Sequence, residues 1–203
     1  MAERRQGRRV RSGAGRLVTD ANRGPMTEDA YWTGPHWTFS LRLYGSEPVR
    51  AACLSLQERF GLDVSLLFVI LYYAVRRGFL PPDGVLSEAV RLTGPVRDAV
   101  IRPLRRIRDD IKQTPPGDLA EKNQTVRKAV LQAELLAEQL EQAMLARFLD
   151  ERSAGASSRP PQDVTALIVA VVSCFAIGRA GPAADDPDIA TLSRAVAALP
   201  PAD

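Results

Sequence analysis

Histidine is almost missing from this sequence, and its scarcity removes several kinds of catalytic site. The one histidine is His36, in the segment GPHW. Ser–His–Asp triads and Cys–His pairs need an imidazole as general base, so none can be drawn without His36. We expect His36 to lie at the surface or to pack within the N-terminal aromatic segment. The sequence therefore predicts no catalytic residues, and we lean against an enzyme while leaving that question open.

Cysteine and glycine-rich loops are scarce as well. Cys53 and Cys174 lie far apart, each within an apolar helical pattern, which is typical of buried thiols in a reducing compartment. No Cys or His spacing resembles a zinc site, and GAGR at residues 13–16 lacks the Lys-Ser/Thr of a phosphate loop. The start of the chain also lacks the apolar stretch of a signal peptide. We expect no metal ion, no cofactor and a cytoplasmic location.

Long hydrophobic runs are absent too. The two longest runs cover twelve residues, Val64 to Val75, and fourteen residues, Val164 to Ile177. A helix needs about 20 apolar residues to cross a bilayer, so we expect no transmembrane segment. Twelve residues also exceed a usual strand of about 5–6 residues. Asp63 as N-cap and Gly78 as terminator predict a helix that other helices surround on all sides.

The same reasoning along the chain predicts an all-α bundle of about six to seven helices. We expect helices at about residues 47–60, 64–77, 84–93, 96–113, 119–151, 164–177 and 188–198. Gly94-Pro95 should end the third helix, and Pro103 should kink the fourth. The aromatic segment 31–49 should form a helical turn or an extended strip docked on the bundle.

The chain divides into four parts. Residues 1–30 form a disordered basic arm, 31–151 a helical domain, 152–163 a linker, and 164–203 a helical pair packed on the bundle. Residues 1–25 hold seven Arg against Glu3 and Asp20, a charge of +5, which leaves 3 − 5 = −2 for the rest. The arm predicts weak, non-specific contact with nucleic acid or anionic membranes. Met26 offers a second translation start that would remove the arm.

The longest predicted helix, 119–151, carries an apolar seam. Its members recur at alternating spacings of four and three residues: Val126, Val130, Ala133, Ala137, Leu140 and Met144. This pattern is typical of a coiled coil, although it covers only about three heptads. The seam packs either against the chain's own bundle or against a second copy or a protein partner, and both alternatives stay open.

Arginines are concentrated in the predicted helix 96–113 and form the candidate site for an anion or an acidic partner. They are Arg97, Arg102, Arg105, Arg106 and Arg108. Guanidinium groups match phosphate and carboxylate geometry. The alternative is a solvated face in which Arg105 pairs with Asp109 and Arg106 with Asp110. The acidic segment ADDPD at residues 184–188 is typical of a helix cap rather than of a metal site.

Three segments resemble a known family. They are WTFSLRLY at residues 37–44, ACLSLQERFGLDVSLLFVILYYA at 52–74 and PLRRIRDDIK at 103–112. Together they are similar to an uncharacterised family of small helical proteobacterial proteins, described only as a domain of unknown function. Ser65 stands where this resemblance leads us to expect Asn. The resemblance covers about residues 37–150 and implies helices and a bacterial setting, with no activity to transfer.

These observations leave three hypotheses. The first is a non-catalytic protein-interaction or scaffold module. The second is a bundle that binds a small molecule or lipid, either as a binding protein or as an enzyme, with polar groups from Cys53, Ser65, Tyr72 and Tyr73. The third and weakest is nucleic-acid association through the basic arm.

Overall fold

The described residues of this computed structural model, 28–114, 117–154 and 163–200, confirm the all-α prediction and contain no strand. The first helices are α1 (Glu28–Thr33), α2 (Pro35–Tyr44), α3 (Glu47–Phe60), α4 (Val64–Arg77) and α5 (Asp83–Val96). After a π-helical segment, η1 (Arg97–Ile101), come α6 (Arg102–Gln113), the short 3-10 turn η2 (Gly117–Leu119), α7 (Ala120–Ser153), α8 (Val164–Ser173) and α9 (Pro187–Ala198). Residues 1–27 of the predicted arm and 155–162 of the predicted linker lie outside the described residues.

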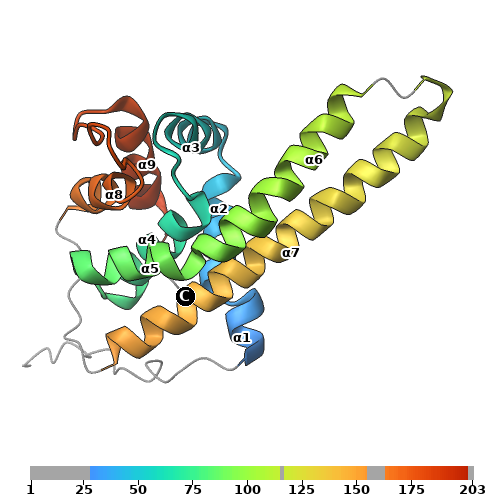
Figure 1. The fold of residues 1–203 in the computed structure, drawn as a ribbon. Coiled ribbons are helices and arrows are strands. Elements are labelled where there is room, and N and C mark those ends of the chain that lie inside the picture. Colours follow the sequence, from blue (N-terminus) through green and yellow to red (C-terminus); the bar gives the residue numbers. More distant parts are fainter. Residues whose placement is uncertain (1–27, 115–116, 155–162, 201–203) are drawn as a thin grey trace, which may run out of the picture.

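Helix α4 is the centre of the fold and has the bounds that its sequence predicts. Asp63 caps it by accepting a hydrogen bond from the backbone of Leu66 at 3.1 Å, and Gly78 ends it with φ of 65°. All residues from 66 to 74 are buried, because α2, α7 and α8 pack around it (Figure 1). In the described part of the chain, no helix has both the length and the hydropathy that a bilayer crossing requires.

The predicted break at Gly94-Pro95 does not exist. Helix α5 runs through both residues and continues through η1 into α6, forming one long bent rod (Figure 1). Proline has no backbone N–H and crowds the preceding helical turn. The wide π turn lies between Pro95 and Pro103 and relieves both positions, because it changes the hydrogen-bond pattern where these prolines would disrupt it.

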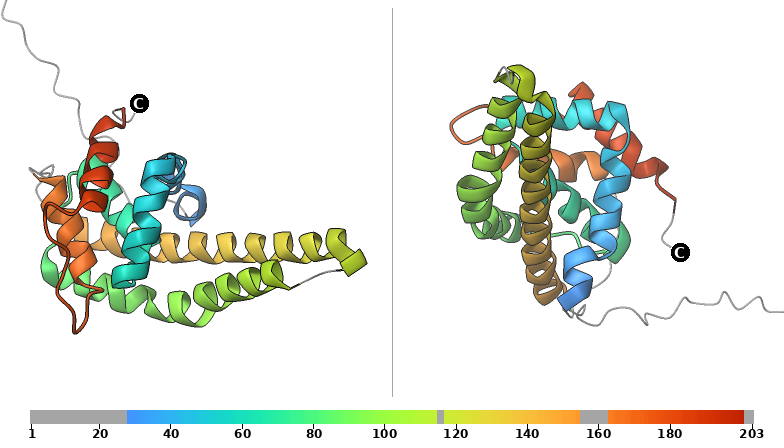
Figure 2. Two further views of the ribbon diagram at one scale, coloured as in Figure 1. Left: turned by 90° about the horizontal axis from the view of Figure 1, so that it is seen from above. Right: turned by 90° about the vertical axis from the view of Figure 1, so that its right-hand side faces the viewer.

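Helices α6 and α7 form an antiparallel hairpin whose tip projects beyond the rest of the molecule (Figures 1 and 2). The C-terminal half of α7 crosses the body and packs against α1, α4 and α5. On the other side of the body, α9 packs along α3, and α8 packs against α4 and α9. Arg59 of α3 holds the start of α9 through ion pairs of 2.7 Å with both Asp186 and Asp188.

The central position of α4 makes Leu67 a sensitive test of the fold. Its side chain is fully buried, so Leu67→Asp would place an unpaired carboxylate in the core, and we expect it to abolish cooperative thermal unfolding. Leu67→Ala should fold but lose about 2–5 kcal/mol. Circular dichroism melts would measure both, with Leu80→Asp on the exposed surface as the control. A cooperatively melting Leu67→Asp variant would contradict the central placement.

Candidate functional site

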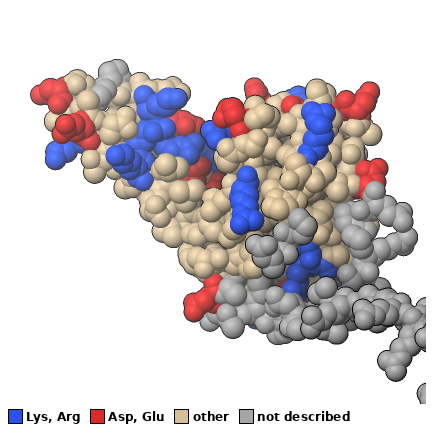
Figure 3. Space-filling view, turned by 180° about the vertical axis from the view of Figure 1, so that it is seen from behind, with Lys and Arg blue, Asp and Glu red and all other residues tan. Residues whose placement is uncertain are grey.

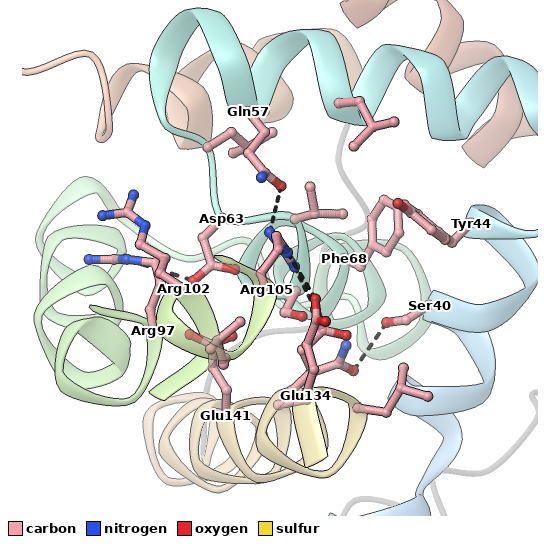
Figure 4. Close-up of a pocket in the computed structure, with 18 of the residues that line it drawn as sticks. Ser40, Tyr44, Gln57, Asp63, Phe68, Arg97, Arg102, Arg105, Glu134 and Glu141 are labelled. Atoms are coloured by element: carbon pink, nitrogen blue, oxygen red, sulfur yellow. Dashed lines mark hydrogen bonds and ion pairs between the residues drawn. The ribbon is translucent and has the colours of Figure 1, made fainter. Parts of the chain in front are cut away.

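A cleft of about 590 Å³ lies at the root of the α6–α7 hairpin. Its lining comes from α2, α3, the start of α4, η1, α6 and α7, so segments from residue 37 to residue 142 meet there (Figure 4). Part of its lining is apolar: Trp37, Leu41, Tyr44, Leu54, Phe68, Leu131 and Leu135. Other lining residues carry charged groups, which makes the cleft amphipathic.

Helix α2 brings the first aromatic motif to the cleft. Of the two forms expected for this segment, a helical turn or an extended strip, the structure has a helix from Pro35 to Tyr44. Residues 37, 40, 41 and 44 share one helical face and line the cleft, whereas Phe39 and Leu43 enter the core. Ser40 donates a hydrogen bond from Oγ to Gln142 Oε1 at 3.1 Å and so ties α2 to α7.

Four of the five candidate arginines line the cleft, and carboxylates already bind them. Arg105 donates to Glu134 at 2.9 Å and to Glu138 at 2.8 Å on α7, and Arg108 donates to Glu134 at 2.6 Å. Arg102 binds Asp98 at 2.8 Å. The expected Arg105–Asp109 pair is therefore wrong, because Arg105 reaches across to α7 rather than along its own helix.

The remaining two candidate arginines differ from each other. Arg97 is largely buried and lies beside Asp63, with 3.7 Å between Nη1 and Oδ2. Arg106 is exposed and does not line the cleft. Seen from behind, Lys and Arg side chains gather on the hairpin and at its junction with the body (Figure 3).

The floor of the cleft is a pair of buried carboxyl groups, Asp63 and Glu141 (Figure 4). Asp63 is 7% exposed and Glu141 only 1%. Burial, followed by the charge of Asp63 and a hydrogen bond between the two carboxyls, raises the pKa of Glu141 far above its ordinary value. The raised pKa favours the protonated form of Glu141 near neutral pH.

Three buried polar atoms of the floor form no hydrogen bond with donors or acceptors of the described residues. They are Asp63 Oδ2, Glu141 Oε1 and Arg97 Nη1, of which Arg97 Nη1 and Asp63 Oδ2 lie 3.7 Å apart as an ion pair. Such atoms are rare in folded proteins and commonly mark places where a ligand, ion or water binds. Close by, burial raises the pKa of Glu138 to about 6, although Arg105 opposes that shift.

The sequence reasoning missed both floor carboxyls. Asp63 was interpreted only as a helix cap, a role that its other oxygen does perform. Glu141 lies outside the predicted seam, of which Val126, Ala133 and Leu140 are exposed. The face that α7 actually buries contains Glu134, Ala137, Glu141, Gln142 and Leu145. The four- and three-residue spacing of Glu134, Glu138 and Glu141 was the signal for an acidic face turned inward.

Other candidate residues lie elsewhere. His36 is fully buried rather than at the surface; burial lowers its pKa to about 4, and its ring meets Tyr72 edge-on at 6.2 Å. Tyr73 donates to Asp150 at 2.7 Å within the core. Four polar residues were proposed for a ligand pocket: Cys53, Ser65, Tyr72 and Tyr73. Of these, Ser65 lines the cleft. Across the described ranges, no group of three His, Cys, Asp or Glu side chains is placed to hold a metal ion.

Comparison with known proteins gives one match. Residues 35–145 match the model of a family described as "Protein of unknown function (DUF2390)". This match includes every residue that lines the cleft, from Trp37 to Gln142. No curated protein and no solved structure matches the chain.

Two adjacent arginines test the ion pairs at the hairpin root. Arg105→Ala leaves Glu134, which is 3% exposed, without one of its two guanidinium partners. We expect a loss of about 2–4 kcal/mol, because breaking a buried pair strands a charge and the partial exposure of Arg105 reduces that cost. Arg106→Ala on the same helix should change stability by less than about 0.5 kcal/mol. Urea unfolding would compare them, and equal losses would contradict this assignment.

Proposed function

The chain belongs to the DUF2390 family, and we propose that it is a small-molecule-binding protein whose ligand occupies the cleft at the hairpin root. The cleft carries this proposal because its lining combines apolar side chains with buried polar atoms that form no hydrogen bond. Ligand sites in proteins combine these two features: apolar walls supply contact area, and a few polar groups fix orientation. An amphipathic molecule fits this arrangement.

The position of the family motifs supports the proposal. WTFSLRLY supplies the α2 wall, the segment GLDVS supplies Asp63 and Ser65, and PLRRIRDD supplies Arg105 and Arg108. Each motif also contributes to the core or to helix pairing, but the cleft is where side chains from all three motifs meet. Ser65 is the residue at which the resemblance led us to expect Asn, so this chain has a shorter side chain in the lining.

A substitution that fills the cleft tests ligand binding. Ser65 is half-buried at the start of α4, and Ser65→Trp should occupy the space between α4 and α7. With 1-octanol as a neutral amphipathic probe, we expect binding by the unmodified protein and at least about tenfold weaker binding by the variant, measured by isothermal titration calorimetry. The control is Gln132→Trp, on the exposed face of α7. Equal binding by all three proteins would refute the proposal.

A second candidate function is self-association through the outer face of α7. An exposed apolar stripe, defined here as Val126, Ala129, Ala133, Leu136 and Leu140, follows 3-4-3-4 spacing. The three larger side chains are 54%, 42% and 44% exposed, in chain order. The flanking residues Gln132 and Gln139 are uncharged, so two copies would meet without like-charge repulsion, and the alanines permit close approach of the helices. We therefore favour a second copy of this chain over another partner.

Substituting the stripe tests self-association. Leu140→Glu would place a charge in the seam and should turn a dimer into a monomer without loss of stability, because the side chain is already exposed in one copy. Sedimentation equilibrium would measure the mass, with Lys128→Glu outside the stripe as control. Even a weak dimer should form at about 100 μM. If the unmodified protein is still a monomer at that concentration, this candidate is removed.

Nucleic-acid contact through residues 1–25 and a cytoplasmic location stay predictions. The arm lies outside the described residues. The free thiol of Cys53 is buried, and Cys174 is also unpaired, which supports a reducing compartment.

A further inference from the structure

We propose that the ligand of the cleft is an organic cation with an apolar tail, a primary alkylammonium whose charged head binds between Asp63 and Glu141. This inference rests on the proposed function, because it specifies the chemistry of the molecule that the cleft takes. It also specifies that the ligand carries a positive charge, which the amphipathic lining alone does not determine.

The first step is the chemistry of the unpartnered atoms. Asp63 Oδ2 and Glu141 Oε1 are carboxyl oxygens, which accept hydrogen bonds, and an ammonium group supplies three donors. Both side chains are more than nine-tenths buried and lie at the floor (Figure 4). A donor group that reaches them would satisfy acceptors that no N–H of the described residues satisfies.

The second step is the charge balance of the lining. Five carboxyl groups line the cleft, namely Asp63, Asp109, Glu134, Glu138 and Glu141, against four guanidinium groups, namely Arg97, Arg102, Arg105 and Arg108. The excess of one carboxyl over the guanidinium groups is 5 − 4 = 1, and the proton held by the floor pair compensates it. A cavity that retains an extra proton already selects positive charge.

The third step is the exchange itself. When the ammonium head enters, Glu141 ionises and releases its proton to solvent, so the ammonium replaces a proton and the net charge of the site is unchanged. No covalent bond forms. The charged groups that face Glu141 are Asp63 before α4, Arg97 of η1 and Glu138 of α7. Arg97 stays beside Asp63 and opposes the ammonium, so both carboxylates are needed to hold it.

An anionic ligand fits less well. Arg105 and Arg108 already donate to Glu134 and Glu138 at 2.6 to 2.9 Å, and Arg102 is held by Asp98. An anion at Arg105 or Arg108 would have to break these pairs and leave Glu134, almost fully buried, without its partners. Arg97 Nη1 forms no hydrogen bond, but it lies 3.7 Å from Asp63 Oδ2, so an anion there would meet a buried carboxylate. The cation requires only the displacement of a proton.

The tail has a place in the same cleft. Tyr44 and Phe68, whose rings meet edge-on at 6.4 Å, together with Leu131 and Leu135, contribute apolar surface to the same lining as Asp63 and Glu141. A volume of about 590 Å³ lies within the range of small-molecule sites.

Three probes of equal length test the charge sign: octylammonium, 1-octanol and octanoate. We expect octylammonium to bind at least about tenfold more tightly than either of the others. Calorimetry in two buffers with different ionisation enthalpies should show about one proton released per octylammonium, and its Kd should fall by up to about tenfold per pH unit between pH 6 and 8. Octanol binding should not depend on pH.

Glu141→Gln provides the matched variant, because glutamine keeps the volume and the neutral state of the empty site but cannot ionise. It should lower octylammonium affinity at least tenfold at pH 8 (about 1.4 kcal/mol) and abolish the proton release, while octanol binding is retained. Glu151→Gln, exposed near the end of α7, should match the unmodified protein. Octanol binding without preference for octylammonium would overturn the charge assignment and leave the proposed function standing. Tighter binding of octanoate would overturn it in favour of an anion site. Failure of all three probes would refute both.

Discussion

The cleft exists because Arg105 joins three helices at the root of the hairpin. Its guanidinium donates to Glu134 and Glu138 of α7 and to Gln57 of α3. These acceptors hold the Arg105 side chain in one position. Because Arg105 belongs to α6, they also set the distance between α6 and the helices beneath it. A buried charged group requires partners in a defined geometry, so this contact sets the spacing between α3, α6 and α7. The hollow between these helices follows from that spacing.

Local patterns predicted the helices well where caps and burial agree. The cap residue, apolar run and terminal glycine of α4 all indicate the same bounds, and the structure has them. Prediction failed at Gly94-Pro95, where local chemistry favours a break but packing of α5 and α6 on α7 maintains a continuous rod. Tertiary contacts outweighed the local preference there, and a π turn accommodated the prolines.

The site was harder to predict than the fold, for a physical reason. Hydrophobic periodicity identifies a buried face only when that face is apolar, and α7 buries Glu134 and Glu141 while leaving Leu136 and Leu140 exposed. Four of the five candidate arginines line the cleft. They could be predicted because their clustering on one predicted helix is visible in the sequence. The partners of Arg105 and Arg108 on α7 could not be predicted, since they lie 26 to 33 residues further along the chain. The first residues of the distinctive motif around α4 line the cleft, and among them the sequence predicted a pocket role for Ser65 alone.

The π segment η1 has a consequence for the direction in which the side chains of α6 point. Each residue of an α-helix turns the chain by about 100°, and the wide turn at residues 97–101 holds one residue more than an α-helical turn does. If the same residues formed regular α-helix instead, α6 would be rotated about its axis by roughly 100°. Arg105 and Arg108 would then point away from α7 with every side chain still present in the sequence. The ion pairs at the hairpin root therefore depend on the π turn before them as strictly as on the residues that form them.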